Sequence, residues 1–147
     1  MKEIVRSNGL SDGRYVEPYA GGAAVAWELL LTGVVRRVSI NDISLPVFSF
    51  WHSVLNSTDE LCSLIRDCPL TIEEWDRQKN VFRRPEEADY LSLGFSFFFL
   101  NRTNRSGILN GGVIGGRGQT GKWKIDARFN RSDLISRIKN CVTQNSD

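Results

Sequence analysis

The pattern of hydrophobic and polar positions changes period twice in the first third of the chain. Residues 14–19 form a short strand-like run that ends in a turn containing Gly21-Gly22. Residues 23–31 are rich in helix formers and end at a Thr-Gly pair, which is typical of a helix C-cap. Residues 34–40 are β-branched and strand-like. This order of strand, glycine turn, helix and strand predicts one βαβ unit.

The middle of the chain has apolar residues at helical spacing. A helix is expected from Ser44, with Pro46 in its first turn. Residues 57–60 and 71–74 both match the capping-box pattern, in which a hydroxyl and an acid satisfy the first N–H groups of a helix. Four helices are therefore predicted, one from Ser44 to about Leu55 and the others over residues 61–66, 75–81 and 86–100.

The periodic pattern stops at Asn101. Seven of the thirteen glycines of the chain lie in the segment that follows, up to Gly121. A segment of this length and composition is expected not to pack against itself, and it is typical of loops that carry function or disorder. Beyond it, residues 123–126 are predicted to form a short strand, and Asn130 is expected to cap a basic helix through Lys139.

The composition describes one domain with a hydrophobic core. Of 147 residues, 41% are hydrophobic and 24% are charged, as in ordinary globular proteins. No apolar run approaches the roughly 20 residues that a membrane span requires, and no signal peptide is evident, so a cytoplasmic protein without membrane association is expected. The three cysteines form no CxxC pair and leave an odd thiol, which argues against a disulfide framework or a metal site.

The charge is unevenly distributed along the chain. Residues 101–147 carry nine Lys/Arg against three Asp, a net charge of +6, whereas the first hundred residues carry ten Lys/Arg against fourteen Asp/Glu, a net charge of −4. A basic C-terminal third is a candidate surface for phosphates. The alternative is an ordinary solvated loop and helix.

The glycine turn is a candidate site for a nucleoside-containing cofactor. Glycines between a strand and a helix let the backbone approach a ligand closely. Asp42 follows the second strand, 20 residues after Gly22, where an acid can accept hydrogen bonds from ribose hydroxyls. The alternative is a tight structural turn, with Asp42 capping the next helix.

The segment Glu17-Pro18-Tyr19-Ala20-Gly21-Gly22-Ala23 resembles motif I of the Dam-like adenine-specific DNA methyltransferases, E-P-F-x-G-x-G. The resemblance implies binding of S-adenosylmethionine (SAM) and a Rossmann-like α/β fold. The cofactor residues that it implies are Glu17, Tyr19, Gly21, Gly22, Ala23 and Asp42. Ala23 stands in the second glycine place, so a positive φ or a close ligand at this position would lower the affinity for the cofactor.

The stretch from Phe99-Leu100-Asn101-Arg102-Thr103-Asn104-Arg105 to Phe129-Asn130 resembles the DNA-contacting segment of the same family. The resemblance implies double-stranded DNA as partner, and Arg and Asn side chains suit contacts to phosphates and base edges. The expected contact residues are Asn101, Arg102, Asn104, Arg105, Lys122 and Lys124. Alternatively, Asn101 and Arg102 hold the backbone of the loop itself.

The aromatic residues divide between core and surface. Trp27, Trp51 and Trp75 are expected in the core, whereas Trp123, between two lysines, is a candidate to lie against a sugar or base. His52 has no acid or cysteine beside it in the sequence, and a structural role is expected.

The Asp-Pro-Pro-Tyr motif, with which the family holds the flipped adenine, is absent, since no two of the four prolines are adjacent. No catalytic residue is therefore assigned. The expectation is a single partial Rossmann-like domain, with residues 1–43 as the cofactor-binding βαβ unit, 44–130 as an inserted helical and loop region for DNA recognition, and 131–147 as a return helix and tail.

The expected function is site-specific adenine-N6 methylation, as in restriction–modification or phage DNA, with the chain alone inactive. A C-terminal catalytic portion or a homo-oligomer would complete it. The rivals are a non-catalytic DNA-binding or assembly module derived from such an enzyme and a dinucleotide-binding oxidoreductase, which gives no reason for the polar segment after Leu100.

Overall fold

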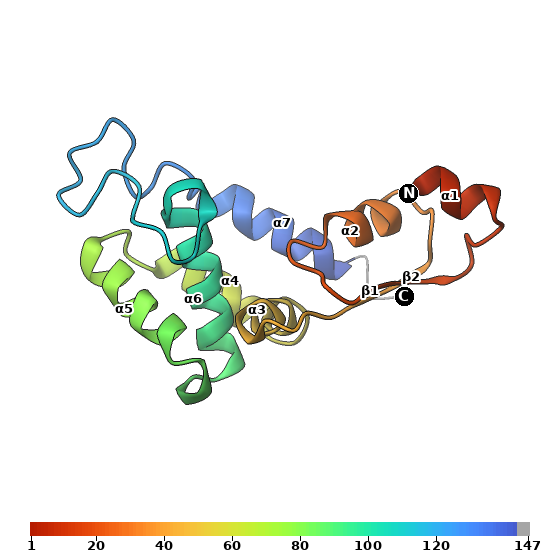
Figure 1. Cartoon of the computed structure of the whole chain (residues 1–147), viewed down its shortest axis with the longest axis horizontal. Helices are drawn as coiled ribbons and strands as arrows, with labels where there is room; N and C mark the ends of the chain where they lie inside the picture. The colour runs from red at the N-terminus through yellow and green to blue at the C-terminus, as the bar shows by residue number, and fades with distance from the viewer. Residues whose placement is uncertain (144–147) are drawn as a thin grey trace.

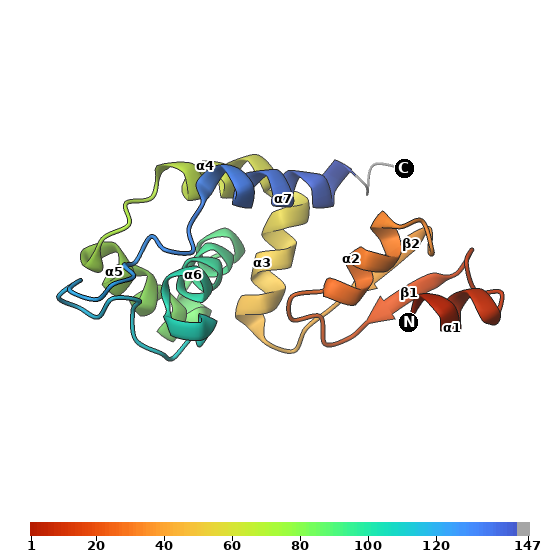
Figure 2. The ribbon, with the colours of Figure 1, turned by 90° about the horizontal axis from the view of Figure 1, so that it is seen from above.

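The computed structural model describes residues 1–143, with a small parallel sheet at one end and a helical body with a long loop at the other (Figures 1 and 2). Strands β1 (Arg14–Glu17) and β2 (Arg37–Ile40) pair in parallel, with Tyr15 opposite Val38. Helix α2 (Ala24–Leu31) connects them. The predicted βαβ unit is confirmed, but the sheet of the described residues has only these two strands, so a full Rossmann sheet is not confirmed.

Helix α2 covers one face of this sheet. Tyr15 and Val38 pack with the buried Leu29 of α2 on that face. Because side chains alternate along a strand, Val16 points to the opposite face, where it is 58% exposed. One face of the parallel pair is therefore uncovered by the described part of the chain.

Helix α1 (Lys2–Ser7) precedes the sheet and was not predicted. Among its six residues only Val5 is buried, so no apolar period reveals it. Val5 packs against Leu29, and Lys2 forms an ion pair with Glu28 at 2.9 Å. The helix is therefore held by contacts with α2 that a local pattern does not contain.

The helical body confirms the four helices predicted in the middle of the chain and the basic helix after the loop, with shifted ends. They are α3 (Leu45–Asn56), α4 (Thr58–Asp67), α5 (Ile72–Arg83), α6 (Tyr90–Thr103) and α7 (Arg131–Thr143). Helix α6 lies at the centre and packs against α3, α4 and α5. It is buried on nearly every side, which explains why its sequence is apolar rather than amphipathic.

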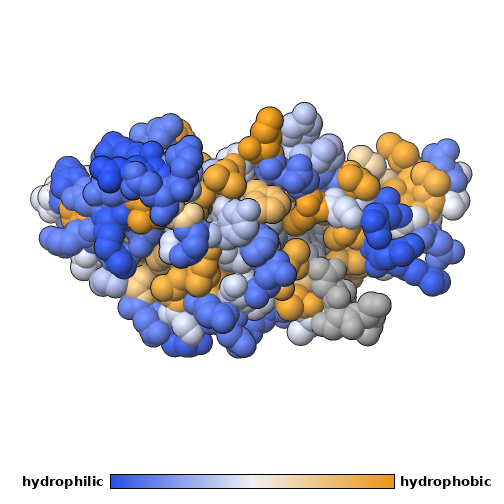
Figure 3. All heavy atoms as spheres, turned by 90° about the horizontal axis from the view of Figure 1, so that it is seen from below, coloured by the Kyte–Doolittle hydropathy of each residue, from blue (hydrophilic) through white to orange (hydrophobic). Residues whose placement is uncertain are grey.

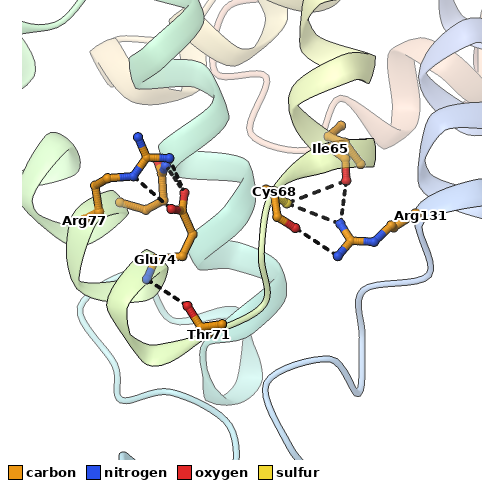
Figure 4. A network of polar contacts seen from close by, with 7 residues as sticks. Ile65, Cys68, Thr71, Glu74, Arg77 and Arg131 are labelled. Carbon is orange, nitrogen blue, oxygen red and sulfur yellow. Dashed lines mark hydrogen bonds and ion pairs between the residues drawn. The ribbon is translucent and has the colours of Figure 1, made fainter.

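The helix N-termini differ in part from the predicted capping boxes. Ser57 makes no side-chain cap hydrogen bond. Thr71 accepts from the backbone N–H of Glu74 at 3.2 Å, but the carboxylate of Glu74 turns to Arg77 and Gln78 instead of back to Thr71. Only the hydroxyl half of one predicted box is therefore formed (Figure 4).

The guanidinium of Arg131 fastens the start of α7 to the end of α4 (Figure 4). It donates to the carbonyl oxygens of Ile65 at 2.8 Å and Cys68 at 2.9 Å. A positive charge on the last carbonyls of a helix also favours the helix dipole. Helices α4 and α7 therefore pack side by side, as Figure 2 shows.

The N-terminus of α7 is capped as predicted, because Asn130 accepts from the N–H of Asp133 at 3.2 Å. The helix runs beyond the predicted end, to Thr143, and residues 144–147 of the predicted tail lie outside the described residues. The strand predicted at residues 123–126 is wrong, because this segment forms turns and pairs with no strand. Its local composition is strand-like, but the loop brings no partner strand to it.

The predicted burial of three tryptophans is confirmed. Trp27, Trp51 and Trp75 are buried, and the three cysteines are free thiols. His52 is half-buried against the rings of Phe48 and Tyr90, at centroid distances of 6.0 and 4.6 Å. Within residues 1–143, no helix has the length and apolar character needed to cross a membrane.

Candidate functional site

The Gly21-Gly22 turn is fixed between the end of β2 and helix α3. The N–H of Gly21 donates to Asp42 Oδ2 at 2.9 Å, and its carbonyl oxygen accepts from Trp51 Nε1, also at 2.9 Å. The N–H of Ala20 donates to the carbonyl of Asn41 at 2.9 Å. The turn is therefore held in one shape before any ligand binds.

The backbone of this turn is open to a ligand. A Cβ added at Gly21 or Gly22 would meet no atom within 4 Å. Gly21 has φ of 49°, and Ala23, the N-cap of α2, has φ of 50°. Ala23 thus adopts the left-handed conformation that glycine favours, at the position where the sequence departs from motif I.

Asp42 caps the next helix, which was the alternative considered from the sequence, and also braces the glycine turn. Its Oδ2 accepts from Gly21, and its Oδ1 accepts from the N–H of Ser44, the N-cap of α3, at 2.9 Å. Each carboxylate oxygen can accept a second hydrogen bond, so Asp42 braces the turn and still has acceptor capacity for a ligand hydroxyl. A small pocket of about 140 Å³ lies beside it, and the side chains of Ile40, Phe48, Trp51 and Leu55 form its apolar walls.

Glu17 and Tyr19 have different positions. Glu17 Oε2 accepts from the N–H of Ala26 at 3.1 Å and so caps the first turn of α2. Its carboxylate therefore stabilises the first turn of α2, the helix that follows the glycine turn. Tyr19 is 74% exposed, so its side chain is accessible to a ligand.

A larger pocket of about 510 Å³ brings the two regions singled out in the sequence together. Gly21, Gly22 and Trp51 line it on the side of the sheet, and Asn101 and Arg102 line it at the end of α6. Residues of α7, among them Arg137, complete the wall. The segments around residues 21 and 101, 80 positions apart, therefore face one space.

Arg102 lies partly buried in this wall. Burial lowers the pKa of its guanidinium, and the positive charges of Arg128 and Arg137 lower it further. Its Nε is buried and has no hydrogen-bond acceptor among the described residues. Asn101, next to it, donates to the carbonyl of Gly107 at 3.3 Å. Asn101 thus has the loop-holding role considered as the alternative, while Arg102 keeps an unused donor.

Asn104 is fully buried and holds the start of the loop. Its Oδ1 accepts from Trp75 Nε1 at 2.7 Å, and its Nδ2 donates to the carbonyls of Ile108 and Leu109 at 2.9 and 3.0 Å. The side chain has no exposed surface and no donor to spare. In this structure Asn104 is therefore a residue that shapes the loop rather than one that DNA reaches.

A second side-chain amide, Gln119, holds the far end of the loop, and nothing in the sequence pattern identified it. Its Nε2 donates to the carbonyls of Ile114 and Gly116 at 2.8 and 2.7 Å, and its Oε1 accepts from the N–H of Ile125 at 2.9 Å. The expectation that this glycine-rich segment does not pack against itself is wrong. The two amides substitute for the missing secondary structure by satisfying backbone groups.

The loop carries basic side chains at its surface, at the end of the molecule whose underside is mainly hydrophilic (Figure 3). Arg105, Lys122 and Lys124 are exposed in the loop and form no ion pair within residues 1–143. The ring of Trp123 is 66% exposed, with Lys122 Nζ 5.6 Å from its centroid. These side chains are available to a polyanion and to a stacking base.

The part of the chain that the structure describes holds no group of three or more His, Cys, Asp or Glu side chains that could bind a metal ion. The arrangement instead offers an open glycine turn, a braced carboxylate and a basic loop around one pocket. Such an arrangement suits a nucleoside ligand and a phosphate-rich partner.

Comparison with known proteins agrees with this chemistry. Residues 1–144 match the family model of D12 class N6 adenine-specific DNA methyltransferases. Over 105 residues the chain is 29% identical to the Type II methyltransferase M.MjaIII of Methanocaldococcus jannaschii. That similarity covers 65% of this chain and 36% of the relative, so the chain spans little more than a third of the relative's length. No solved structure matches the chain.

Proposed function

Because the chain belongs to the D12 class of N6 adenine-specific DNA methyltransferases, we propose that it binds SAM and double-stranded DNA for the methylation of adenine N6. The observation that carries the proposal is the shared pocket, which has the Gly21-Gly22 turn on one side and Asn101 and Arg102 on the other. Methyl transfer needs the methyl donor and the target base within contact distance. One space bordered by both regions meets this requirement.

The turn and its neighbours fit the cofactor. The missing side chains of Gly21 and Gly22 leave room above the backbone. Asp42 has acceptor capacity for ribose hydroxyls, and the small pocket beside it has the apolar walls that suit an adenine ring. When bound, SAM supplies the electrophilic methyl group. Residues 1–43 would position it, with Tyr19 above the turn and Glu17 and Ala23 supporting the start of α2.

DNA would meet the opposite side of the same pocket. In this proposal Arg102, Arg105, Lys122 and Lys124 contact the duplex, while Asn101 and Asn104 hold the loop that presents them. Arginine and lysine at these positions neutralise phosphates, and arginine can also read guanine through two parallel hydrogen bonds. Residues 44–130 would thus form the recognition region.

In the family that the sequence resembles, the Asp-Pro-Pro-Tyr motif accepts the hydrogens of the adenine amino group. The sequence has no adjacent prolines and hence no Asp-Pro-Pro-Tyr motif. We therefore propose that residues 1–147 alone bind both ligands without transferring the methyl group, and that further residues complete the enzyme. N6-methyladenine in DNA treated with pure 1–147 and SAM would contradict this part of the proposal.

Calorimetric titration of purified 1–147 with SAM tests the cofactor half. We expect the wild type to bind and Asp42→Asn to bind about tenfold more weakly, because the amide nitrogen that replaces one carboxylate oxygen cannot accept a hydrogen bond from a backbone N–H or a ribose hydroxyl. Asp12→Asn is the control, because Asp12 is an exposed carboxylate that pairs only with Arg36. A folded wild-type protein that does not bind SAM would instead favour the rival function, a DNA-binding module without the chemistry.

A further inference from the structure

Three arginines from separate segments lie near one another, and two of them, Arg102 and Arg137, line the pocket. Arg102 lies in the last turn of α6, Arg128 lies in the turns before α7, and Arg137 lies in α7. Arg128 Nη1 would be 3.6 Å from a Cβ placed on Gly107, the residue that Asn101 holds. We propose that Arg102, Arg128 and Arg137 together bind one phosphate group of the DNA backbone beside the pocket. This inference rests on the proposed function, which supplies the DNA.

The charge around these arginines is not balanced by the protein. Asp133 pairs with Arg137 Nε at 3.0 Å. Within residues 1–143, neither Arg102 nor Arg128 forms an ion pair. Three guanidiniums thus share one carboxylate, which leaves a net charge of about +2 to be compensated by an anion or by solvent.

The environment of Arg102 favours an anion over solvent. Its buried Nε has no acceptor, and a buried donor without a partner destabilises the free protein. Burial and the charges of Arg128 and Arg137 lower the pKa of Arg102, which means that its cationic form is disfavoured where it lies. A bound anion would supply the acceptor and offset the repulsion at once.

A phosphate group is the anion that suits this geometry. Guanidinium groups present planar pairs of N–H donors that match phosphate oxygens, and three of them from separate segments can supply donors to several oxygens of one phosphate. Arg102 and Arg137 also line the pocket that reaches Gly21 and Gly22. A DNA strand held here by a phosphate would run past the turn, so the contact would help to place the target nucleotide. A free phosphate ion has the same chemistry, and the test must separate the two sources.

The test measures the affinity of 1–147 for two labelled duplexes of unrelated sequence, by fluorescence anisotropy at several salt concentrations. The variants are Arg128→Gln and Arg137→Gln, both at exposed positions. Each is expected to weaken binding to both duplexes by about tenfold, because phosphate contacts carry no sequence information. The slope of log affinity against log salt should decrease by about 0.9 for the loss of the phosphate contact.

Arg36→Gln is a matched control. Like Arg137, Arg36 is exposed and pairs with an aspartate through Nε, at 2.9 Å. It lies just before β2, outside the proposed phosphate site. It should leave both the affinity and the slope unchanged. Asp133→Asn provides a change of opposite sign, because removal of the competing carboxylate should tighten binding to both duplexes by several-fold.

The outcomes separate the two proposals. If the wild type binds duplex DNA while Arg128→Gln and Arg137→Gln behave like Arg36→Gln, the phosphate site is refuted and DNA binding stands. If the wild type binds no duplex, the proposed function fails and the site fails with it. Inorganic phosphate is titrated separately, and displacement of the duplex at submillimolar phosphate would assign the site to the free ion and overturn the DNA contact.

Discussion

Gly94 of α6 lies directly against the backbone of Ser49 in α3, so that a Cβ on Gly94 would be 2.6 Å from the carbonyl oxygen of Ser49. The backbones of the two helices therefore approach each other as closely as glycine permits. Helix α3 carries Trp51, which holds the glycine turn, and α6 ends in Asn101 and Arg102. This contact thus sets the distance between the two sides of the candidate site.

Gly94→Ala should destabilise the protein by about 1–3 kcal/mol, because the added methyl group meets backbone atoms that cannot rotate away. The urea dependence of unfolding measures this change. In a helix without this close neighbour, the same substitution would stabilise the protein by about 1 kcal/mol. The sign of the change in the free energy of unfolding therefore tells whether the two backbones are in contact. A stabilised variant would show that the two helices are not in this contact.

Gly21→Ala should destabilise the protein by about 1–2 kcal/mol, because Gly21 has a positive φ that alanine disfavours. Gly22→Ala is the matched control, since it is next in sequence and is also free of neighbours within 4 Å but does not have a positive φ. Thermal unfolding of the two variants compares them. Equal stabilities would show that the turn does not have the conformation described.

Asn104→Ala should destabilise the protein by about 2–3 kcal/mol, because it leaves Trp75 Nε1 and two loop carbonyls without partners. It should also weaken DNA binding, since the loop loses its shape. Asn110→Ala, an exposed asparagine of the same loop, should change stability by less than about 0.5 kcal/mol. Denaturant unfolding and DNA anisotropy measure the two effects, and a stable Asn104→Ala variant with undiminished DNA binding would assign the side chain no role in the loop.

Arg131→Ala should destabilise the protein by about 1.5–3 kcal/mol, because the carbonyls of Ile65 and Cys68 lose a charged donor. Arg131→Lys should recover only part of this loss, since an ammonium group lacks the planar fork that reaches both carbonyls. Arg66→Ala removes a charge from the same end of α4 and serves as control. Urea unfolding of the three variants compares their losses of stability. Equal losses for Arg131→Ala and Arg66→Ala would show that Arg131 contributes only a positive charge and not its hydrogen bonds to the two carbonyls.

The pair Arg117 and Asp76 connects the loop to α5 through two hydrogen bonds of 2.8 Å, and the Arg117 guanidinium lowers the pKa of Asp76 below its usual 3.8. Because the folded pKa is lowered, this contact stabilises the loop above pH 3.8 and is lost as the pH falls through the folded value. An NMR titration of the Asp76 carboxyl carbon should therefore give a pKa below 3.8, and Arg117→Gln should return it toward 3.8. The same pKa in both proteins would mean that the ion pair does not form in solution.

The sequence predicted those parts of the fold that depend on local pattern. The βαβ unit and the helices from α3 to α7 are visible because glycines, caps and apolar spacing define them within a few residues. Helix α1 was missed because Val5 is its only buried residue and its contacts are with residues of another helix. The strand predicted at residues 123–126 has strand-like residues but no partner strand, and pairing is a property of the whole fold.

The candidate site shows the same division. Gly21, Gly22 and Asp42 are adjacent to strand ends, so their convergence followed from the parallel pair. Asn104 and Gln119 are polar residues in a loop, and such residues can either face solvent or form hydrogen bonds with the backbone. The sequence does not distinguish these two arrangements, because they depend on how the chain folds. The closeness of Arg128 and Arg137 to Arg102 depends on how α7 returns along the body, which no local pattern contains.

The two side-chain amides that organise the loop have a thermodynamic consequence for recognition. Asn104 and Gln119 satisfy six backbone or indole partners without any DNA present, and the Arg117–Asp76 pair anchors the segment between them. The conformational entropy of this segment is therefore lost when the protein folds rather than when it binds. Association with a duplex should accordingly proceed without the large negative heat-capacity change that marks coupled folding, and the affinity should not be reduced by a cost of ordering.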